Sequence, residues 1–265
     1  MNNKRHVFCL DVPALRYCRL GDTSVRIIAI HYLSERYHLD PVIVPPRSEA
    51  FYPLWRKAFG EDRIVTDINL LPDSHRRASI SAPTSLDWEH SQKGLNVFEC
   101  VMWENGFFDT ANMYIRPPQI FHAGIKIPAI MIYPFERTDG NSVYDSNWWI
   151  EVCTLIRSKG FSINLLGDRR CAQLQKLFDT VEFDYICAPT IEGLKRCTEN
   201  SCMAIGSSTG PTWTLLMSDI PQIVLQSGVH YESYWNFDRC QKVLAKRLKI
   251  FTRLESLFEW RTGWF

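Results

Sequence analysis

The chain has 265 residues, enough for one large domain or two smaller ones. Hydrophobic residues make up 46% and charged residues 22%, a globular composition that excludes disorder as the main state. The net charge of +1 gives no argument for a polyanionic partner, so any basic surface must be local. Aromatic residues reach 13% with 9 Trp, and their flat faces can stack on sugars or bases as well as fill a core.

Targeting signals and metal motifs are missing from the sequence pattern. The apolar run at residues 7–10 stops at Asp11, which is too short for a signal peptide, and no run of about 18 apolar residues occurs. The 9 cysteines are an odd number without a C-x-x-C pair. We therefore expect a soluble protein of the cytoplasm with reduced thiols and no bound metal.

The first half begins with a βαβ pattern. Residues 7–12 predict a strand, apolar positions between 25 and 36 fall on helical spacing, and residues 41–44 predict a second strand. The stretch 47–94 shows few clean periods apart from a strand predicted at 64–68, and a buried run follows at 97–103. The prolines between 117 and 128 indicate a linker, which predicts domains at 1–125 and 126–265.

Short strands and helices alternate regularly in the second half. The predicted strands are 129–133, 162–166, 185–187, 203–205 and 222–225. The predicted helices are 147–158, a stretch ending near 179, 191–198 and 212–218. This alternation is typical of a parallel sheet covered by helices on both faces, and it predicts a Rossmann-like α/β domain.

The C-terminal residues 238–260 predict one long amphipathic helix. Its apolar stripe lies beside a basic stripe consisting of Arg239, Lys242, Lys246, Lys249 and Arg253. The basic stripe is explained either by a solvated face of a packing helix or by binding of an anionic ligand or a nucleic-acid backbone.

The most informative segment follows the strand at 203–205. Gly206 permits a tight turn, three hydroxyl residues follow, Gly210 lets a ligand approach the backbone, and Pro211 suits the first position of a helix. A helix N-terminus with hydroxyl groups beside it favours a phosphate. Helix capping by Ser208 or Thr209 alone explains the same pattern.

These features occur in an order that resembles a known family. Residues 132–134, Trp148, 160–167, 205–211 and 220–221 look like the donor-binding half of GT-B glycosyltransferases, and most closely like the heptosyltransferases of glycosyltransferase family 9. That family also carries a Gly-Asp pair at its first helix, which Gly21 and Asp22 match. It typically has Asp-Thr-Gly-Pro followed two residues later by His, whereas this chain has Ser208 in place of the Asp and Trp213 in place of the His.

The resemblance implies two Rossmann-like domains facing a central cleft and an inverting transfer of a sugar from a nucleotide-diphosphate donor, without a metal or other cofactor. Asp22 is the implied general base, although a plain helix cap explains an Asp at this position equally well. The residues implied to bind the donor diphosphate are Ser208, Thr209, Gly210 and Arg137. Arg169 and Arg170 are the second choice after Arg137 for the cation. The implied nucleotide residues are Tyr133, Gly167, Asp168 and Glu232.

The acceptor stays open at this point. It is either a glycan, as the family suggests, or a hydroxymethylated base in DNA, as in phage enzymes that modify DNA inside an infected bacterial host. DNA would use the basic stripe with Arg76, Arg77 and Arg47 for phosphates. Trp213 would offer a stacking surface in either case. The departures from the family pattern also allow a catalytically inactive nucleotide-sugar-binding protein.

Overall fold

A computed structural model describes residues 4–10, 19–71, 79–81, 95–104, 106–107, 109, 113–124, 127–134, 146–168, 174–207, 209–225, 244 and 248–251. The chain divides into two compact units: unit 1 comprises Met1–Ile120 and Glu232–Ala245, and unit 2 comprises Phe121–Tyr231 and Lys246–Phe265. The first boundary between the units lies between residues 120 and 121. The prolines predicted a boundary between residues 125 and 126. No helix in the described ranges has the length and apolar character needed to cross a membrane.

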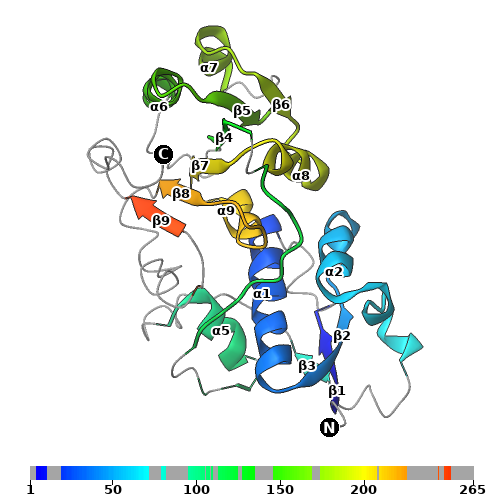
Figure 1. The fold of residues 1–265 in the computed structure, drawn as a ribbon. Coiled ribbons are helices and arrows are strands. Elements are labelled where there is room, and N and C mark those ends of the chain that lie inside the picture. The colour runs from blue at the N-terminus through cyan, green and yellow to red at the C-terminus, as the bar shows by residue number, and fades with distance from the viewer. Residues whose placement is uncertain are drawn as a thin grey trace. The chain divides into compact units, whose positions relative to one another are not determined.

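Unit 1 is built on a parallel sheet (Figure 1). Its strands β1 (Lys4–Cys9), β2 (Leu39–Val44) and β3 (Ser79–Ser81) lie in the order β2-β1-β3. The strands predicted at 7–12 and 41–44 are confirmed, although both begin earlier than expected. Alternate residues pack on opposite faces, so that Val7 and Cys9 join Val42 and Val44 in one cluster.

The helices of unit 1 pack around α1 (Leu20–Arg36), which confirms the helix predicted there. α1 contacts α2 (Tyr52–Phe59) and α5 (Val97–Glu104), so the buried run at 97–103 is a helix. The described part of unit 1 also contains three short 3-10 helices: η2 (Glu49–Phe51), η3 (Glu61–Arg63) and η4 (Ile68–Leu70).

The strand predicted at 64–68 is wrong. Ile64 forms only an isolated parallel bridge with Ile43, and η4 begins at Ile68. The Asp67 carboxylate accepts hydrogen bonds from the backbone and side-chain nitrogens of Asn69 at 2.8 and 2.9 Å. This side-chain-to-backbone bond turns the chain and competes with strand pairing.

Unit 2 contains a parallel sheet in the order β6-β5-β4-β7-β8-β9. Its strands are β4 (Ala129–Tyr133), β5 (Ser162–Leu166), β6 (Tyr185–Cys187), β7 (Met203–Ser207), β8 (Gln222–Leu225) and β9 (Leu248–Phe251). Numbered along the chain from β4, the order reads 3-2-1-4-5-6, which is the doubly wound order of the Rossmann fold. The prediction of a Rossmann-like second half is confirmed.

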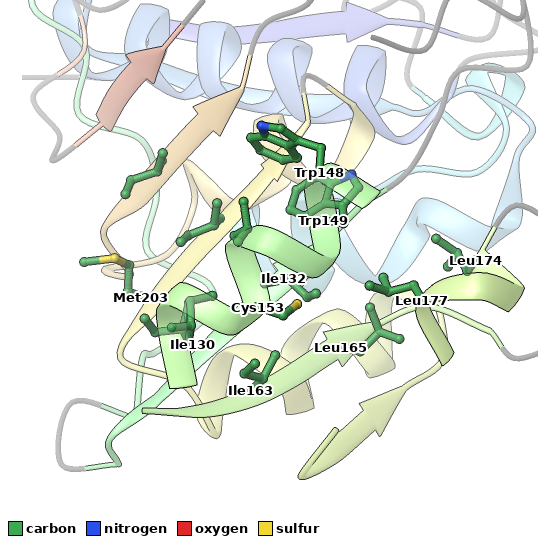
Figure 2. Close-up of a cluster of buried hydrophobic side chains, with 14 residues drawn as sticks. Ile130, Ile132, Trp148, Trp149, Cys153, Ile163, Leu165, Leu174, Leu177 and Met203 are labelled. Atoms are coloured by element: carbon green, nitrogen blue, oxygen red, sulfur yellow. The ribbon is translucent and has the colours of Figure 1, made fainter. Parts of the chain in front are cut away.

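Helices cover both faces of this sheet. The helices are α6 (Ser146–Ser158), α7 (Gln175–Thr180), α8 (Ile191–Glu199) and α9 (Gly210–Leu215). Figure 2 shows the core on one face, where Trp148, Trp149 and Cys153 of α6 pack with sheet residues such as Ile132 and Leu165. On the other face, the Asn164 amide donates to the Ser201 hydroxyl, just after α8, at 2.9 Å.

The helix predicted at 238–260 is wrong in the parts that the structure describes. Leu248–Phe251 form β9, which pairs parallel with β8, and Leu244 forms an isolated bridge with Ile115. Strand pairing explains why residues 248–251 are not helical. β9 forms backbone hydrogen bonds with β8, whose N–H and C=O groups would otherwise be unpaired at the edge of the sheet. Lys249 of the predicted basic stripe therefore lies on a strand and not on a helix. The other four residues of the stripe lie outside the described residues.

Candidate functional site

The sheet of unit 2 has a topological switch point between β4 and β7. The chain runs outward from β4 through β5 to β6 and then returns to β7 on the other side of β4. In open α/β sheets, ligands bind outside the carboxyl ends of the strands at such a point. Tyr133 ends β4 and pairs in register with Gly206 of β7, so the loop that follows Gly206 lies at the switch point.

The close packing of Gly206 on Tyr133 shapes this loop. A Cβ atom at residue 206 would overlap three ring carbons of Tyr133. The Tyr133 side chain is fully buried and its hydroxyl donates to Gln222 Oε1 at 3.3 Å. Burial raises the pKa of Tyr133, so its hydroxyl remains a protonated donor. The ring therefore supports the loop from the interior.

The loop itself is held by hydroxyl groups. Thr212 Oγ1 donates to the Ser207 carbonyl at 2.7 Å, lies 3.4 Å from the Tyr133 hydroxyl and accepts from the Thr209 N–H at 3.4 Å. Thr209 Oγ1 also donates to the Ser207 carbonyl, at 3.3 Å. Thr209 and Gly210 are partly exposed, and α9 begins at Gly210. The predicted loop before a helix is confirmed, whereas Ser208 lies outside the described residues.

The neighbouring strand contributes a second loop at the same edge. Gly167 and Asp168 follow β5, and the Gly167 N–H donates to the Cys187 carbonyl of β6 at 2.8 Å. Gly167 is buried and Asp168 is partly exposed. Both predicted residues therefore lie at the carboxyl edge, one strand away from Tyr133.

The other predicted site residues, for donor and acceptor alike, divide into two groups. Trp213 is 3% exposed, so its ring lies inside unit 2 and offers no open stacking face in this structure. The rest lie outside the described residues: Arg76, Arg137, Arg169, Arg170 and Glu232. Within the described part of the chain, no three His, Cys, Asp or Glu side chains gather as ligands for a metal ion.

Unit 1 has a switch point of its own, and Asp22 belongs to the helix that follows one of its two strands. The order β2-β1-β3 puts a switch point between β1 and β3, and α1 is the helix that follows β1. Asp22 is the third residue of α1, and its Oδ2 accepts from the Arg19 N–H at 3.2 Å. Asp22 thus caps the helix, and it is partly exposed in the first turn of the helix that follows β1.

A buried cation close to Asp22 was not predicted from the sequence. Arg26 is 2% exposed, and its Nη1 donates to the Asp22 carbonyl at 3.0 Å. Arg26 Nε and the hydroxyl of Thr23 are buried and have no hydrogen-bond partner among the described residues. The signal in the sequence was an arginine inside the apolar run from Val25 to Ile30.

Solved structures of glycosyltransferases share this fold. A family 9 glycosyltransferase from Veillonella parvula DSM 2008 superposes with a TM-score of 0.59 at 10% identity, over 97% of this chain and 88% of the other. The E. coli heptosyltransferase WaaC, solved with ADP-2-deoxy-2-fluoro heptose, gives 0.54 at 12% identity, over 93% and 92%. The dodecameric iron-containing heptosyltransferase TibC, solved with ADP-D-β-D-heptose, gives 0.55 at 11% identity, over 88% and 60%.

No protein-family model and no curated protein matches the chain. The structural matches therefore define the class by its architecture: an α/β protein with the GT-B fold of glycosyltransferases. More particularly, the fold is the one found in heptosyltransferases of family 9, which confirms the resemblance seen in the sequence at the level of fold.

Proposed function

We propose that this protein is an inverting, metal-independent glycosyltransferase that moves a sugar from a nucleotide-diphosphate donor to an acceptor hydroxyl. The observation that carries the proposal is the hydroxyl-rich loop after Gly206 at the switch point of unit 2. Its position fits a bound diphosphate because switch points and helix starts favour phosphorylated ligands. WaaC, which shares the fold, was solved with ADP and with an ADP-sugar analogue.

Unit 2 is the proposed donor side. The backbone N–H groups of Ser208, Thr209 and Gly210 and the hydroxyls of Ser208 and Thr209 would hold the diphosphate, with Arg137 offsetting the charge that grows on the leaving group. The nucleotide would contact Gly167, Asp168 and Glu232. Because Tyr133 is fully buried, its proposed role is to position the loop rather than to contact the nucleotide.

Unit 1 is the proposed acceptor side, with Asp22 as the general base. The acceptor oxygen attacks the anomeric carbon from the face opposite to the diphosphate, and the Asp22 carboxylate takes the hydroxyl proton. The bond between the anomeric carbon and the phosphate oxygen breaks as the new bond forms. The nucleoside diphosphate leaves with the bonding electrons, and the anomeric configuration inverts.

A saccharide is the proposed acceptor. A DNA acceptor drew its main support from a basic helical stripe, and Lys249 lies on strand β9 instead of a helix. A salt series separates the two classes, since binding to DNA weakens steeply as salt rises whereas binding to a neutral glycan barely changes.

A thermal-shift screen with UDP, GDP, ADP and CMP sugars tests the function. A ligand that binds only the folded state raises its stability, by about 2.7 kcal/mol at a concentration of 100 times its dissociation constant. We expect one nucleotide class to raise the melting temperature, and a chain unaffected by all four would contradict the proposal. Product analysis of the active pair, with and without acceptor, then separates transfer from hydrolysis and from an inactive binding protein.

A further inference from the structure

Two cysteines of unit 2 lie side by side at the rim of its sheet. Cys187 ends β6, the last strand of the sheet on this side, and Cys197 belongs to α8, which packs against β6 (Figure 1). Both are free cysteines. The thiol of Cys197 donates a hydrogen bond to the sulfur of Cys187, so the two sulfur atoms are neighbours although they come from different elements.

The geometry of strand and helix explains this contact. Cys187 pairs in register with Leu166. Because Leu165 packs in the core on the α6 face, side-chain alternation turns Leu166 and Cys187 towards the other face, where α8 lies. On α8, Cys197 shares the buried face with Leu194. The two thiols therefore point towards each other from the sheet and from the helix.

The start of α8 is held against the backbone that follows Cys187. A Cβ atom at residue 193 would overlap the Ala188 carbonyl group, so glycine is required for this close approach. Gly193 lies one helical turn before Cys197 on the same face of α8. Two backbones in contact thus fix the spacing between the helix and the end of β6.

The surroundings make Cys187 the more reactive thiol of the pair. The hydrogen bond from Cys197 lowers the pKa of Cys187, and the charge of Arg196 lowers it further, while burial opposes both effects. The same hydrogen bond and complete burial raise the pKa of Cys197. Since the thiolate is the reactive form, Cys187 is the nucleophile and Cys197 the partner that closes a bridge.

A small oxidant has a route to Cys187 from the rim of the sheet. Cys187 is 5% exposed, and the three residues that follow it, 188–190, are all exposed. Cys197 has no exposed surface. The order of reaction is therefore fixed by access as well as by thiol chemistry.

We propose that Cys187 and Cys197 form a reversible disulfide when hydrogen peroxide oxidises Cys187. The Cys187 sulfur attacks one peroxide oxygen, the O–O bond breaks, and Cys187 becomes a sulfenic acid while its proton leaves with the other oxygen as water. The Cys197 sulfur then attacks the Cys187 sulfur, the S–O bond breaks, and the hydroxyl group leaves with the Cys197 proton as a second water. The thiols lose two electrons and the peroxide gains them. Thiol exchange with a dithiol reverses the bond.

The disulfide would regulate the donor site, a consequence that rests on the proposed function. The Cys187 carbonyl accepts from the N–H of Gly167, which opens the loop proposed to contact the nucleotide, at 2.8 Å. A disulfide bond is about 2.05 Å long, shorter than any contact between two thiols, so its formation draws the two cysteines together. Because α8 already touches the backbone at Ala188, the end of β6 has to shift, and its bond to Gly167 shifts with it. Oxidation should therefore weaken nucleotide binding.

The test treats the full native chain with hydrogen peroxide, blocks the remaining thiols and digests the protein with trypsin without reductant. Cleavage at Lys195 and Arg196 separates the two cysteines, so the disulfide joins two peptides that mass spectrometry detects. We expect the joined peptides from wild type, and their loss after treatment with dithiothreitol. Cys197→Ser should abolish them. Cys202→Ser is the matched control, because Cys202 lies on the same tryptic peptide and its thiol donates to the Ala129 carbonyl at 3.3 Å.

Two results overturn the inference. One is native wild type that yields no joined peptides, and the other is a native protein that yields the same mixture of disulfides as protein oxidised in urea, since the fold would then not select this pair. If Cys197→Ser does not fold, Cys187→Ser carries the test with the same expectation.

Titration of the reduced and oxidised proteins with the nucleotide found in the screen tests the effect on the donor site. We expect the oxidised form to bind about tenfold more weakly. Equal affinities would refute the regulatory consequence alone. Joined peptides from a protein that binds no nucleotide would refute the proposed function and leave the disulfide standing.

Discussion

Gly206→Ala is the substitution for which the structure gives the most definite expectation. The added methyl group would overlap the Tyr133 ring, which is fully buried and bonded through its hydroxyl to Gln222. The ring cannot turn aside without breaking that bond and disturbing the core. We therefore expect the loop after β7 to shift and donor binding to weaken strongly.

The magnitude follows from overpacking. Extra methyl groups in a packed core cost about 1–3 kcal/mol, and Gly206→Ala should lie at the upper end because the clash is with three ring atoms. Truncation of a large buried ring, as in Tyr133→Ala, costs about 3–5 kcal/mol. The double variant has room for the methyl group, so its destabilisation should be smaller than the sum of the two single values by at least about 1 kcal/mol.

Urea unfolding of the four proteins measures this coupling, and the nucleotide titration measures binding in parallel. Tyr133→Phe is the control, because it removes the hydroxyl and keeps the ring; Gly206→Ala should be equally harmful in that background. Free energies that add within about 0.5 kcal/mol would refute the reasoning, because they would show that residue 206 and the ring do not compete for the same space.

Three further predictions follow from other parts of the molecule. Asp22→Asn should abolish transfer while nucleotide binding stays near wild type, with exposed Asp62→Asn as the control; unchanged turnover would refute its role as base. Burial raises the pKa of the Cys153 thiol from 9.0 to about 12, so the folded protein loses stability as pH rises through that range, where only the unfolded thiol ionises. Unfolding free energies of wild type and Cys153→Ala should diverge there by up to about 1.4 kcal/mol per pH unit. Iodoacetamide should label Cys153 far more slowly in the native than in the unfolded protein, and equal rates by mass spectrometry would contradict its burial.

The sequence predicted unit 2 well because its signals are local. The strands at 129–133, 162–166 and 222–225 are short, mostly apolar segments between turn residues, and the structure has them at the same bounds. The two errors arose where pairing or side-chain bonds override periodicity. The apolar spacing around 248–251 fits a helix as well as a strand, and only the neighbouring β8 decides between them. At 64–68, the bonds from Asn69 to Asp67 end the extended segment.

The candidate site was only partly accessible from the sequence. The motifs correctly predicted a loop and a helix start after β7, because glycine and proline have strict backbone preferences. Burial could not be predicted in the same way. Tyr133 was expected to contact the nucleotide and is fully buried, and Arg26 was overlooked because an arginine in a helix is normally exposed. Both outcomes depend on packing between elements far apart in the sequence.

The buried state of Trp213 bears on how the donor could be held. The family pattern has a histidine at this place, whereas here a nearly buried indole anchors α9 in the core of unit 2. Ser208 likewise replaces a charged residue. With those two side chains changed, the proposed recognition of a diphosphate would rely on the backbone N–H groups of the loop, the hydroxyls of Ser208 and Thr209, and Arg137. Backbone donors depend on the path of the chain more than on side-chain identity, and that path is set by Gly206 against Tyr133. Donor affinity should consequently be more sensitive to Gly206→Ala than to Thr209→Ser, which keeps the hydroxyl and leaves the turn unchanged.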